Sequence, residues 1–288
     1  MSEAREISER LPLGKAPYPR YVAAAAHHAA LTMLRRKRTV LAGVIALAPV
    51  IIPLLLAVFT EGAFGHEGGR IFVTLVEDIY VKTLVPLLAL FFGTMLIGED
   101  VESQIIPYWL TRPVPRSAVA LGRLTAFMLV TTALIVPGVF LTFAACTSLG
   151  NFSFSGAHLR LMLHYDAALV AGLLVYGAFC MWLGACFKRP IVLGIAALFG
   201  WQRLALYVPG LVDFFTIEKY VAAVLPPLPQ ARATPVFRTA LAEFQKTQFL
   251  VGATKAAVVL LVITVVFIAL TVVALRRREY SQAKAVEN

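Results

Sequence analysis

The chain is dominated by long apolar stretches that alternate with short polar connections. A transmembrane helix needs about 20 apolar residues, each adding about 1.5 Å, to cross about 30 Å of hydrocarbon. Because no water reaches the backbone there, such stretches fold as helices that satisfy their own hydrogen bonds. Six stretches are long enough: 39–60, 79–97, 120–146, 166–187, 191–211 and 249–275. The sequence therefore predicts an all-α, polytopic membrane protein with six transmembrane helices.

The composition also favours lipid as the surroundings of this chain. Hydrophobic residues make up 59% of the sequence and charged residues only 15%, whereas globular proteins average about 45–50% apolar residues. Charged side chains are too few to cover the surface of a soluble protein of 288 residues. The formal net charge of +10 would suit a nucleic-acid-binding protein. The basic residues, however, gather at the ends of apolar runs, so we expect no nucleic-acid partner.

The positions of the Lys and Arg residues indicate how the chain is oriented. They are concentrated before the first stretch, in the connections after the second and fourth stretches, and in the C-terminal tail, with clusters at 35–38 and 276–278. Positively charged connections stay on the cytoplasmic side. Both termini are therefore predicted to be cytoplasmic. The polar, acidic start of the chain does not resemble a signal peptide, and we expect a multi-pass protein of the bacterial cytoplasmic (inner) membrane.

Three regions follow from this topology. Residues 1–38 are predicted to form a cytoplasmic N-terminal segment, residues 39–275 the six-span transmembrane domain, and residues 276–288 a cytoplasmic tail. The N-terminal segment contains an Ala-rich stretch, 21–34, of residues that favour helices. We expect this stretch to form an interfacial helix that lies along the cytoplasmic membrane surface.

The connection between the second and third stretches, 99–116, carries the most specific features of the sequence. It opens with acidic residues, which favour a helix N-terminus. An apolar segment, 105–110, follows that is too short to span a membrane and contains Trp109. Arg112 precedes a proline and therefore avoids helical geometry. We predict a short helix with an exposed aromatic face suited to a protein groove. The alternative is an ordinary interfacial loop of a polytopic protein.

At this loop the chain resembles the permease subunits of type-2 ATP-binding-cassette (ABC) exporters. In that family an acidic start, a Gly-Thr pair and an apolar stretch lead to Pro-x-x-Arg, and a Gly-Lys or Gly-Arg opens the third span. Here Pro113 and Arg116 match the Pro-x-x-Arg element, and Gly122 and Arg123 match the last element, whereas other residues stand at 103–104 in place of Gly-Thr. The six-span layout with an N-terminal interfacial helix is also similar.

The resemblance implies that the loop forms a coupling helix that docks into a separate nucleotide-binding subunit and transmits its closure to the membrane helices. ATP and Mg²⁺ would bind on that partner, and no cofactor is expected in this chain, which lacks GxxxxGK[ST]. A second permease copy is also implied, in a homodimer or in a heterodimer with a sister permease. The residues assigned to contact with the ATPase subunit are Glu99, Asp100, Glu102, Tyr108, Trp109, Arg112 and Arg116.

The predicted function is therefore that of the membrane-spanning subunit of an ATP-driven exporter. One alternative is an ion-coupled secondary carrier, or another polytopic protein that acts without an ATPase. Such carriers often contain two repeated halves with broken helices, and the sequence shows no such correspondence. An intramembrane enzyme would need clustered His, Glu or Asp residues, as in HExxH, which the sequence also lacks. We predict no catalytic and no metal-binding residues.

Some polar and small residues lie inside the apolar stretches. Gln202 and Arg203 form the deepest polar pair, and either line a substrate path or pair structurally. Asp78 and Lys82 lie four residues apart and are expected to pair, and Asp166 is expected to be a helix-end charge. The residues expected to permit close helix contact are Gly172, Gly177, Gly184, Gly194 and Gly200. The cysteines expected in the core in reduced form are Cys146, Cys180 and Cys186.

Overall fold

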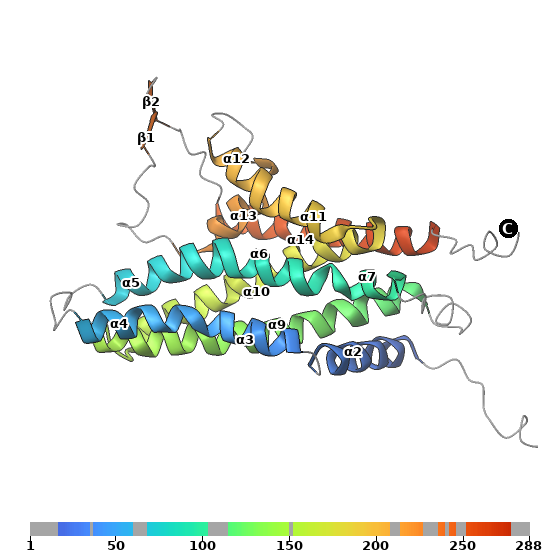
Figure 1. The fold of residues 1–288 in the computed structure, drawn as a ribbon, viewed down its shortest axis with the longest axis horizontal. Helices are drawn as coiled ribbons and strands as arrows, with labels where there is room; N and C mark the ends of the chain where they lie inside the picture. The colour runs from blue at the N-terminus through green and yellow to red at the C-terminus, as the bar shows by residue number, and fades with distance from the viewer. Residues whose placement is uncertain are drawn as a thin grey trace, which may run out of the picture.

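The fold is that of a computed structural model, which describes residues 17–34, 37–59, 68–102, 115–149, 152–207, 214–226, 236–239, 242–245 and 252–277. The long helices run along the long axis of the molecule (Figure 1). Five helical runs are long and apolar enough to cross a membrane: Lys37–Phe59, Gly68–Gly98, Arg116–Leu149, Gly156–Cys186 and Ala253–Arg276. They confirm an all-α, polytopic membrane protein.

The first two long runs are divided into several segments. The first run consists of α3 (Lys37–Leu47), the 3₁₀ turn η1 (Ala48–Val50) and α4 (Ile51–Phe59). The second consists of α5 (Gly68–Leu75), the π-helical η2 (Val76–Leu84), α6 (Val85–Leu88), the π-helical η3 (Ala89–Gly93) and α7 (Met95–Glu102). Pro86 has no N–H group, so it cannot continue the regular backbone ladder. The helix departs from α geometry on both sides of this proline.

The remaining elements follow in chain order. The third run is α9 (Arg116–Cys146) with the 3₁₀ turn η4 (Thr147–Leu149), and the fourth is α10 (Gly156–Cys186). Shorter helical segments come next: α11 (Pro190–Ile195), the π-helical η5 (Ala196–Trp201), α12 (Gln202–Tyr207) and α13 (Ile217–Val224). The last long helix is α14 (Ala253–Arg277).

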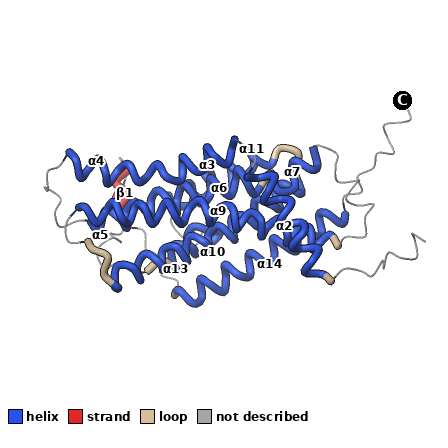
Figure 2. Tube along the Cα trace, turned by 90° about the horizontal axis from the view of Figure 1, so that it is seen from below, coloured by secondary structure: helices blue, strands red, loops and turns tan. Residues whose placement is uncertain are grey.

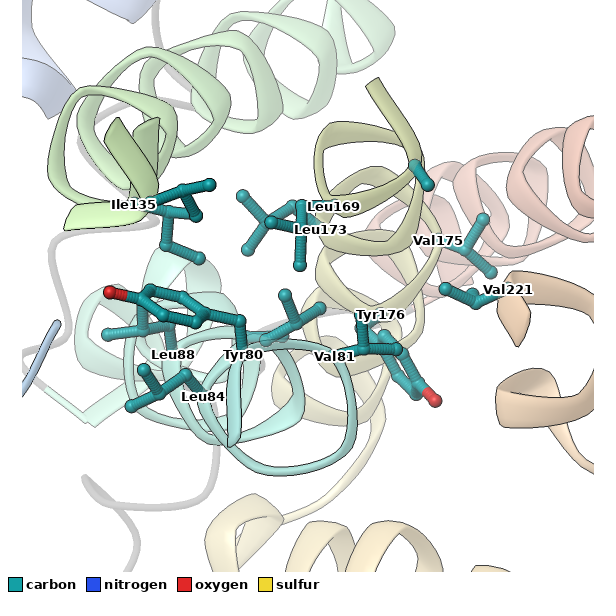
Figure 3. Packing of buried hydrophobic residues seen from close by; sticks show 14 of the residues in the cluster. Tyr80, Val81, Leu84, Leu88, Ile135, Leu169, Leu173, Val175, Tyr176 and Val221 are labelled. Atoms are coloured by element: carbon teal, nitrogen blue, oxygen red, sulfur yellow. The ribbon is translucent and has the colours of Figure 1, made fainter. Parts of the chain in front are cut away.

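Helix α10 lies at the centre of the bundle. It contacts α9, α14, η3, α7, α11 and α13, and its buried residues lie on every side of the helix. A helix that is apolar all round is one that neighbours surround. Figure 3 shows Leu169 and Leu173 of α10 packed between Leu88 of α6 and Ile135 of α9, with Val221 of α13 on the far side of α10.

The outermost long helices are the α3–α4 run and α14, which lie at opposite edges of the bundle (Figure 2). Within their most apolar windows only 22% and 17% of residues are buried, against 67% in Gly68–Gly98 and in α10. Apolar side chains that no protein group covers are stable only where water is absent. These edge helices therefore present the surfaces that suit lipid or another membrane-embedded chain.

Helix α2 (Tyr18–Leu34) precedes the first long run and confirms the helix predicted near the N-terminus. It packs closely along the first turns of α9 (Figure 1). We call this end of the molecule the α2 end: it carries α2, the last turns of α7, the first turns of α9 and the last turns of α14. The position of α2 is thus set by contact with another helix of the same chain.

Two long helices begin earlier than their apolar stretches predict. The second begins at Gly68 in place of residue 79, and the fourth at Gly156 in place of residue 166. The N-terminus of α10 is capped by Ser155, whose Oγ accepts a hydrogen bond from the His158 backbone N–H at 3.4 Å. Hydropathy missed these turns because they carry polar and charged residues. In the second helix, Glu77 and Asp78 have side-chain partners, which are described below.

The predicted fifth span, 191–211, is not confirmed as a full span. Pro190–Trp201 is a shorter apolar helix, and the helical backbone continues through α12 to Tyr207. Residues 208–213 lie outside the part of the chain that the structure describes. The described residues therefore contain five spanning helices and this shorter one, where the sequence predicted six spans.

The connection between α13 and α14 contains a two-stranded antiparallel sheet that the all-α prediction did not include. Strands β1 (Val236–Thr239) and β2 (Ala242–Gln245) pair with Thr239 opposite Ala242 and Val236 opposite Gln245. The strands belong to the connection ahead of α14, so the membrane-spanning part of the described chain is still entirely helical.

Candidate functional site

The acidic residues predicted to contact an ATPase subunit lie in α7. Glu99, Asp100 and Glu102 occupy its last turns, so they continue the second long helix. The expectation that these acids open a separate short helix was wrong, because α7 continues the second long helix through Glu102. Tyr108, Trp109 and Arg112 lie outside the described residues, and their roles stay predictions.

Arg116, the last residue of the predicted coupling loop, is the first residue of α9. Its Nη1 donates hydrogen bonds to the backbone carbonyls of Leu275 at 2.8 Å and Arg276 at 3.0 Å. Both carbonyls belong to the last turn of α14, where carbonyl groups have no partner within the helix. The guanidinium therefore caps the C-terminal end of a helix that lies 159 residues away in the sequence.

Arg123 makes a similar contact to a different helix. It is half-buried, and its Nη1 donates a hydrogen bond to the backbone carbonyl of Leu96 in α7. A carbonyl oxygen has two lone pairs, so it accepts such a bond in addition to one within its helix. Arg38 of α3 donates to the sulfur of Met95, the residue before Leu96. The two flanks of the predicted coupling loop, α7 and α9, are thus joined directly.

Helix α2 docks against the same part of α9. A Cβ built on Gly122 would lie 2.6 Å from both the Ala25 Cβ and the Val22 carbonyl oxygen, so only glycine permits this approach. The hydroxyl of Tyr18 also donates to Ser117 Oγ at 3.1 Å. Gly122 and Arg123 were predicted to open the third span. In the structure α9 has already begun at Arg116, and this pair contacts α2 and α7.

The polar pair in the middle of the chain is described in part. Gln202 is buried, with 4% of its surface exposed, and its Oε1 accepts a hydrogen bond from the hydroxyl of Tyr176 at 3.3 Å. The side chain of Arg203 lies outside the described part of the structure. Gln202 therefore has a structural partner on α10, while a role on a substrate path stays a prediction.

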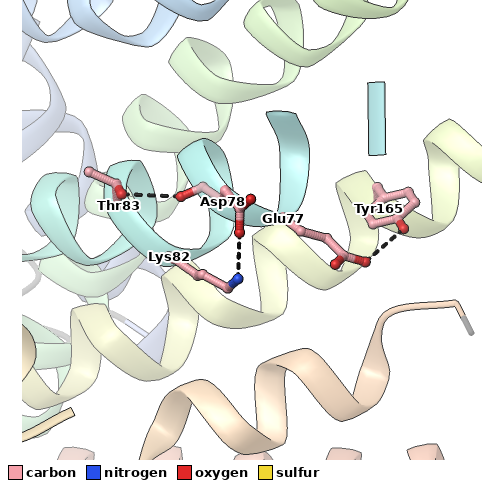
Figure 4. Close-up of polar contacts among 5 residues, drawn as sticks. All are labelled: Glu77, Asp78, Lys82, Thr83 and Tyr165. Carbon is pink, nitrogen blue, oxygen red and sulfur yellow. Dashed lines mark hydrogen bonds and ion pairs between the residues drawn. The ribbon is translucent and has the colours of Figure 1, made fainter. Parts of the chain in front are cut away.

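Between α5 and α6, charged side chains of η2 find partners (Figure 4). Lys82 pairs with Asp78, as predicted. The hydroxyl of Tyr165 on α10 donates to Glu77 Oε1 at 3.1 Å, and Thr83 Oγ1 donates to the Asp78 carbonyl at 3.2 Å. These contacts explain how a charged segment continues the second long helix.

Asp166 is not the helix-end charge that the sequence suggested. It lies well inside α10, with 8% of its surface exposed, and its Oδ1 has no hydrogen-bond partner among the described residues. Nearby polar groups already pair with each other: the hydroxyl of Tyr80 contacts the Ala46 carbonyl at 3.1 Å and Thr142 Oγ1 at 3.0 Å. A carboxyl group in such a place is costly to bury.

Most of the glycines predicted to permit close helix contact do so. A Cβ on Gly177 would lie 2.2 Å from Phe127, one on Gly184 2.3 Å from the Thr94 carbonyl oxygen, and one on Gly194 2.2 Å from Leu90. A Cβ on Gly172 would make an ordinary contact with Val221 at 3.4 Å, whereas one on Gly200 would have no neighbour within 4 Å among the described residues. The prediction is therefore correct for Gly177, Gly184 and Gly194, whereas Gly172 makes only an ordinary contact and Gly200 makes no close contact with the described residues.

The described residues contain no cluster of three or more His, Cys, Asp or Glu side chains that could hold a metal ion. Cys146 and Cys180 are buried and Cys186 is half-buried, and within the described part of the chain they form no disulfide. Cys146 and Cys180 pack as small apolar side chains, which agrees with their predicted place in the core, whereas Cys186 is only half-buried.

The fold is that of a multi-pass membrane protein in which α2, α7 and α14 each contact α9 at the α2 end. The sequence matches the model of the family described as ABC-2 family transporter protein over residues 18–280. The chain therefore belongs to this family and is a permease, the membrane subunit of an ABC transporter. Membership implies an ABC ATPase partner in general. A search of the curated proteins found no match.

Proposed function

We propose that this permease is the membrane-spanning subunit of an ATP-driven exporter, and that a separate nucleotide-binding subunit holds the ATP and Mg²⁺. The proposal rests on family membership and on the resemblance of the loop between α7 and α9 to a coupling helix. The residues proposed to contact the ATPase subunit are Glu99, Asp100, Glu102, Tyr108, Trp109 and Arg112.

The observation that carries this proposal is the continuity of the loop with two long helices. The second long helix reaches Glu102, and α9 begins at Arg116, so only residues 103–115 separate them. A displacement of this short connection acts directly on both membrane helices. Trp109 lies within it, and a large aromatic side chain is suited to anchor the loop in a pocket of a partner.

The charge distribution supports a cytoplasmic location for the α2 end. Lys37, Arg38 and Arg276 are exposed there, and Lys188 and Arg189 are exposed just after the C-terminal end of α10. Positive charge beside membrane helices is retained in the cytoplasm. We propose that both termini are cytoplasmic, that the protein resides in a bacterial inner membrane, and that it pairs with a second permease copy.

Co-purification tests the ATPase partnership. The permease is expressed with a candidate ABC ATPase, and W109A and Y108A variants are compared with the wild-type chain. We expect both variants to retain less ATPase, because the aromatic anchor is lost, while the permease keeps its thermal unfolding temperature. F215A is the matched control, since Phe215 is an aromatic residue with 79% of its surface exposed outside the loop.

Two results would overturn the proposal. If the wild-type permease retains no ABC ATPase and moves solute without nucleotide, the ion-coupled carrier is the better description. If W109A retains as much ATPase as F215A does, the loop is an ordinary interfacial connection. The orientation is checked separately with a cysteine at Ser281, which a membrane-impermeant thiol reagent should label only after intact cells are permeabilised.

A further inference from the structure

Arg116 occupies a position where its charge is unfavourable within its own helix. It is the first residue of α9, and the positive end of the helix dipole disfavours a cation there. The same charge is favourable at the C-terminal end of another helix. Because Nη1 lies 2.8 and 3.0 Å from two carbonyl oxygens of the last turn of α14, the contact between helices accounts for an arginine at this position.

Arg123 lies about two helical turns further along α9 and contacts a different neighbour. Its guanidinium donates to the Leu96 carbonyl in α7, so α9 holds α14 through one arginine and α7 through the other. Both contacts are side chain to backbone, and hydrogen bonds from a charged donor are stronger than those between neutral groups. Arginine provides several donors in a fixed planar arrangement, which a lysine cannot reproduce.

Between the two arginines, α9 also holds α2. Gly122 brings the α9 backbone against Ala25 and Val22, and Ser117 accepts a hydrogen bond from Tyr18. The first turns of α9 therefore contact three other helices, and these turns follow directly after the predicted coupling loop.

We propose that Arg116 and Arg123 are positioning residues that make the α2 ends of α7, α9 and α14 move as one body when the coupling loop is displaced. This inference rests on the proposed function, because the ATPase subunit is what would displace the loop. The contacts of Arg116 and Arg123 lie within the permease and need no partner. It assigns Arg116 to the inside of the permease, in place of a contact with the ATPase subunit. The last span then responds to a loop to which it is not connected in sequence.

The contacts can be tested in the full-length permease alone, reconstituted in lipid nanodiscs. Spin labels are placed on exposed positions of three helices: Phe91 in η3, Leu129 in α9 and Val273 in α14, with Cys186 replaced by serine. The distance distribution between positions 129 and 273 should broaden in R116Q and stay narrow in R123Q. The distribution between 91 and 129 should broaden in R123Q and stay narrow in R116Q. R116K should broaden the first distribution less than R116Q does.

A matched control is R160Q, which removes an exposed arginine at the other end of the bundle and should leave both distributions as in the wild type. If R116Q leaves the 129–273 distribution unchanged, the proposal is wrong. If each variant broadens both distributions to the same extent, the arginines stabilise the bundle generally, and the specific positioning role is also wrong.

The second arm uses the complex of permease and ABC ATPase, trapped with ATP and vanadate. In the wild type, trapping should leave the 129–273 distribution narrow, because α9 and α14 move together. In R116Q it should split the distribution, while co-purification of the ATPase stays at the wild-type level. Loss of ATPase from R116Q would show that Arg116 contacts the partner, which overturns the proposal. Absence of an ATPase from the wild-type preparation would instead contradict the proposed function, and the nanodisc arm would still test the arginines.

Discussion

The backbone of α9 at Gly122 lies directly against Ala25 of α2, so close that a Cβ at Gly122 would be 2.6 Å from the Ala25 Cβ. The Val22 carbonyl oxygen lies at the same distance from that point and cannot move without the α2 backbone. The contact explains why α2, which carries a mixture of alanines and polar residues, has a defined place at the end of the bundle.

G122A should detach α2 from α9. The added methyl group meets backbone atoms, and overpacking of this kind costs about 1–3 kcal/mol. We expect a lower unfolding temperature in detergent, measured with a thiol-reactive dye that reports exposure of the buried Cys146 and Cys180, and faster proteolysis within α2. G200A is the control, because a Cβ on Gly200 would meet no atom within 4 Å in the part of the chain that the structure describes. Equal stability of G122A and G200A would contradict the packing described here.

Two glycines of α10 should respond differently to the same substitution. In G184A the new Cβ would lie 2.3 Å from the Thr94 carbonyl oxygen, whereas in G172A it would lie 3.4 Å from Val221. We expect G184A to lose about 1–3 kcal/mol of stability and G172A to stay close to the wild type. Thermal unfolding of both variants in the same detergent checks this, and the reverse order would show that α10 does not pack on η3 and α7 as described.

Tyr176 and Gln202 should be energetically coupled. Y176F removes the donor to the buried Oε1 of Gln202, which costs about 0.5–1.5 kcal/mol for a neutral hydrogen bond. In a double-mutant cycle with Q202L, the second substitution should cost less once the first is present, because the shared hydrogen bond is already lost. If the two substitutions change the free energy of unfolding by strictly additive amounts, Gln202 has a role that does not depend on Tyr176 of α10.

D166N should not destabilise the protein, although Asp166 is buried. Its Oδ1 has no partner among the described residues, so the neutral amide is less costly to bury than a carboxylate. E77Q is the matched comparison: it weakens the hydrogen bond from Tyr165 and should lose about 1 kcal/mol. The unfolding temperatures of D166N and E77Q test this expectation. A large drop in the unfolding temperature of D166N would mean that the Asp166 carboxylate has a partner that stabilises it.

The spanning helices could be predicted from the sequence because hydropathy measures the main free-energy term that keeps them in lipid. The N-terminal bounds of the second and fourth long helices could not be predicted in this way. The early turns of the second long helix carry Glu77 and Asp78, which count against a span when each is considered alone. In the bundle, Lys82 pairs with Asp78 and Tyr165 donates to Glu77. Whether a charged segment is helical thus depends on neighbours that lie elsewhere in the sequence.

The contacts at the α2 end illustrate a second limit. The Pro-x-x-Arg element identified Arg116 as a residue of interest, but its contact is to the carbonyls of Leu275 and Arg276. Backbone carbonyls are present at every residue, so no residue type marks the acceptor. The same holds for Arg123 and Leu96. Only the relative placement of the helices in three dimensions reveals these pairs, whereas Gly122 was identifiable from its motif.

The small buried fraction of α14 has a mechanical consequence. Only 17% of its most apolar window is buried, because α14 contacts α10, α13 and α9 and most of its apolar surface is left uncovered by the described chain. At Leu275 and Arg276, however, its backbone is tied to Arg116. A helix whose C-terminal end is held and that neighbours cover only in part can tilt toward its uncovered surface about that end. We therefore expect the largest excursions of this helix near Ala253, at the extremity remote from the pivot.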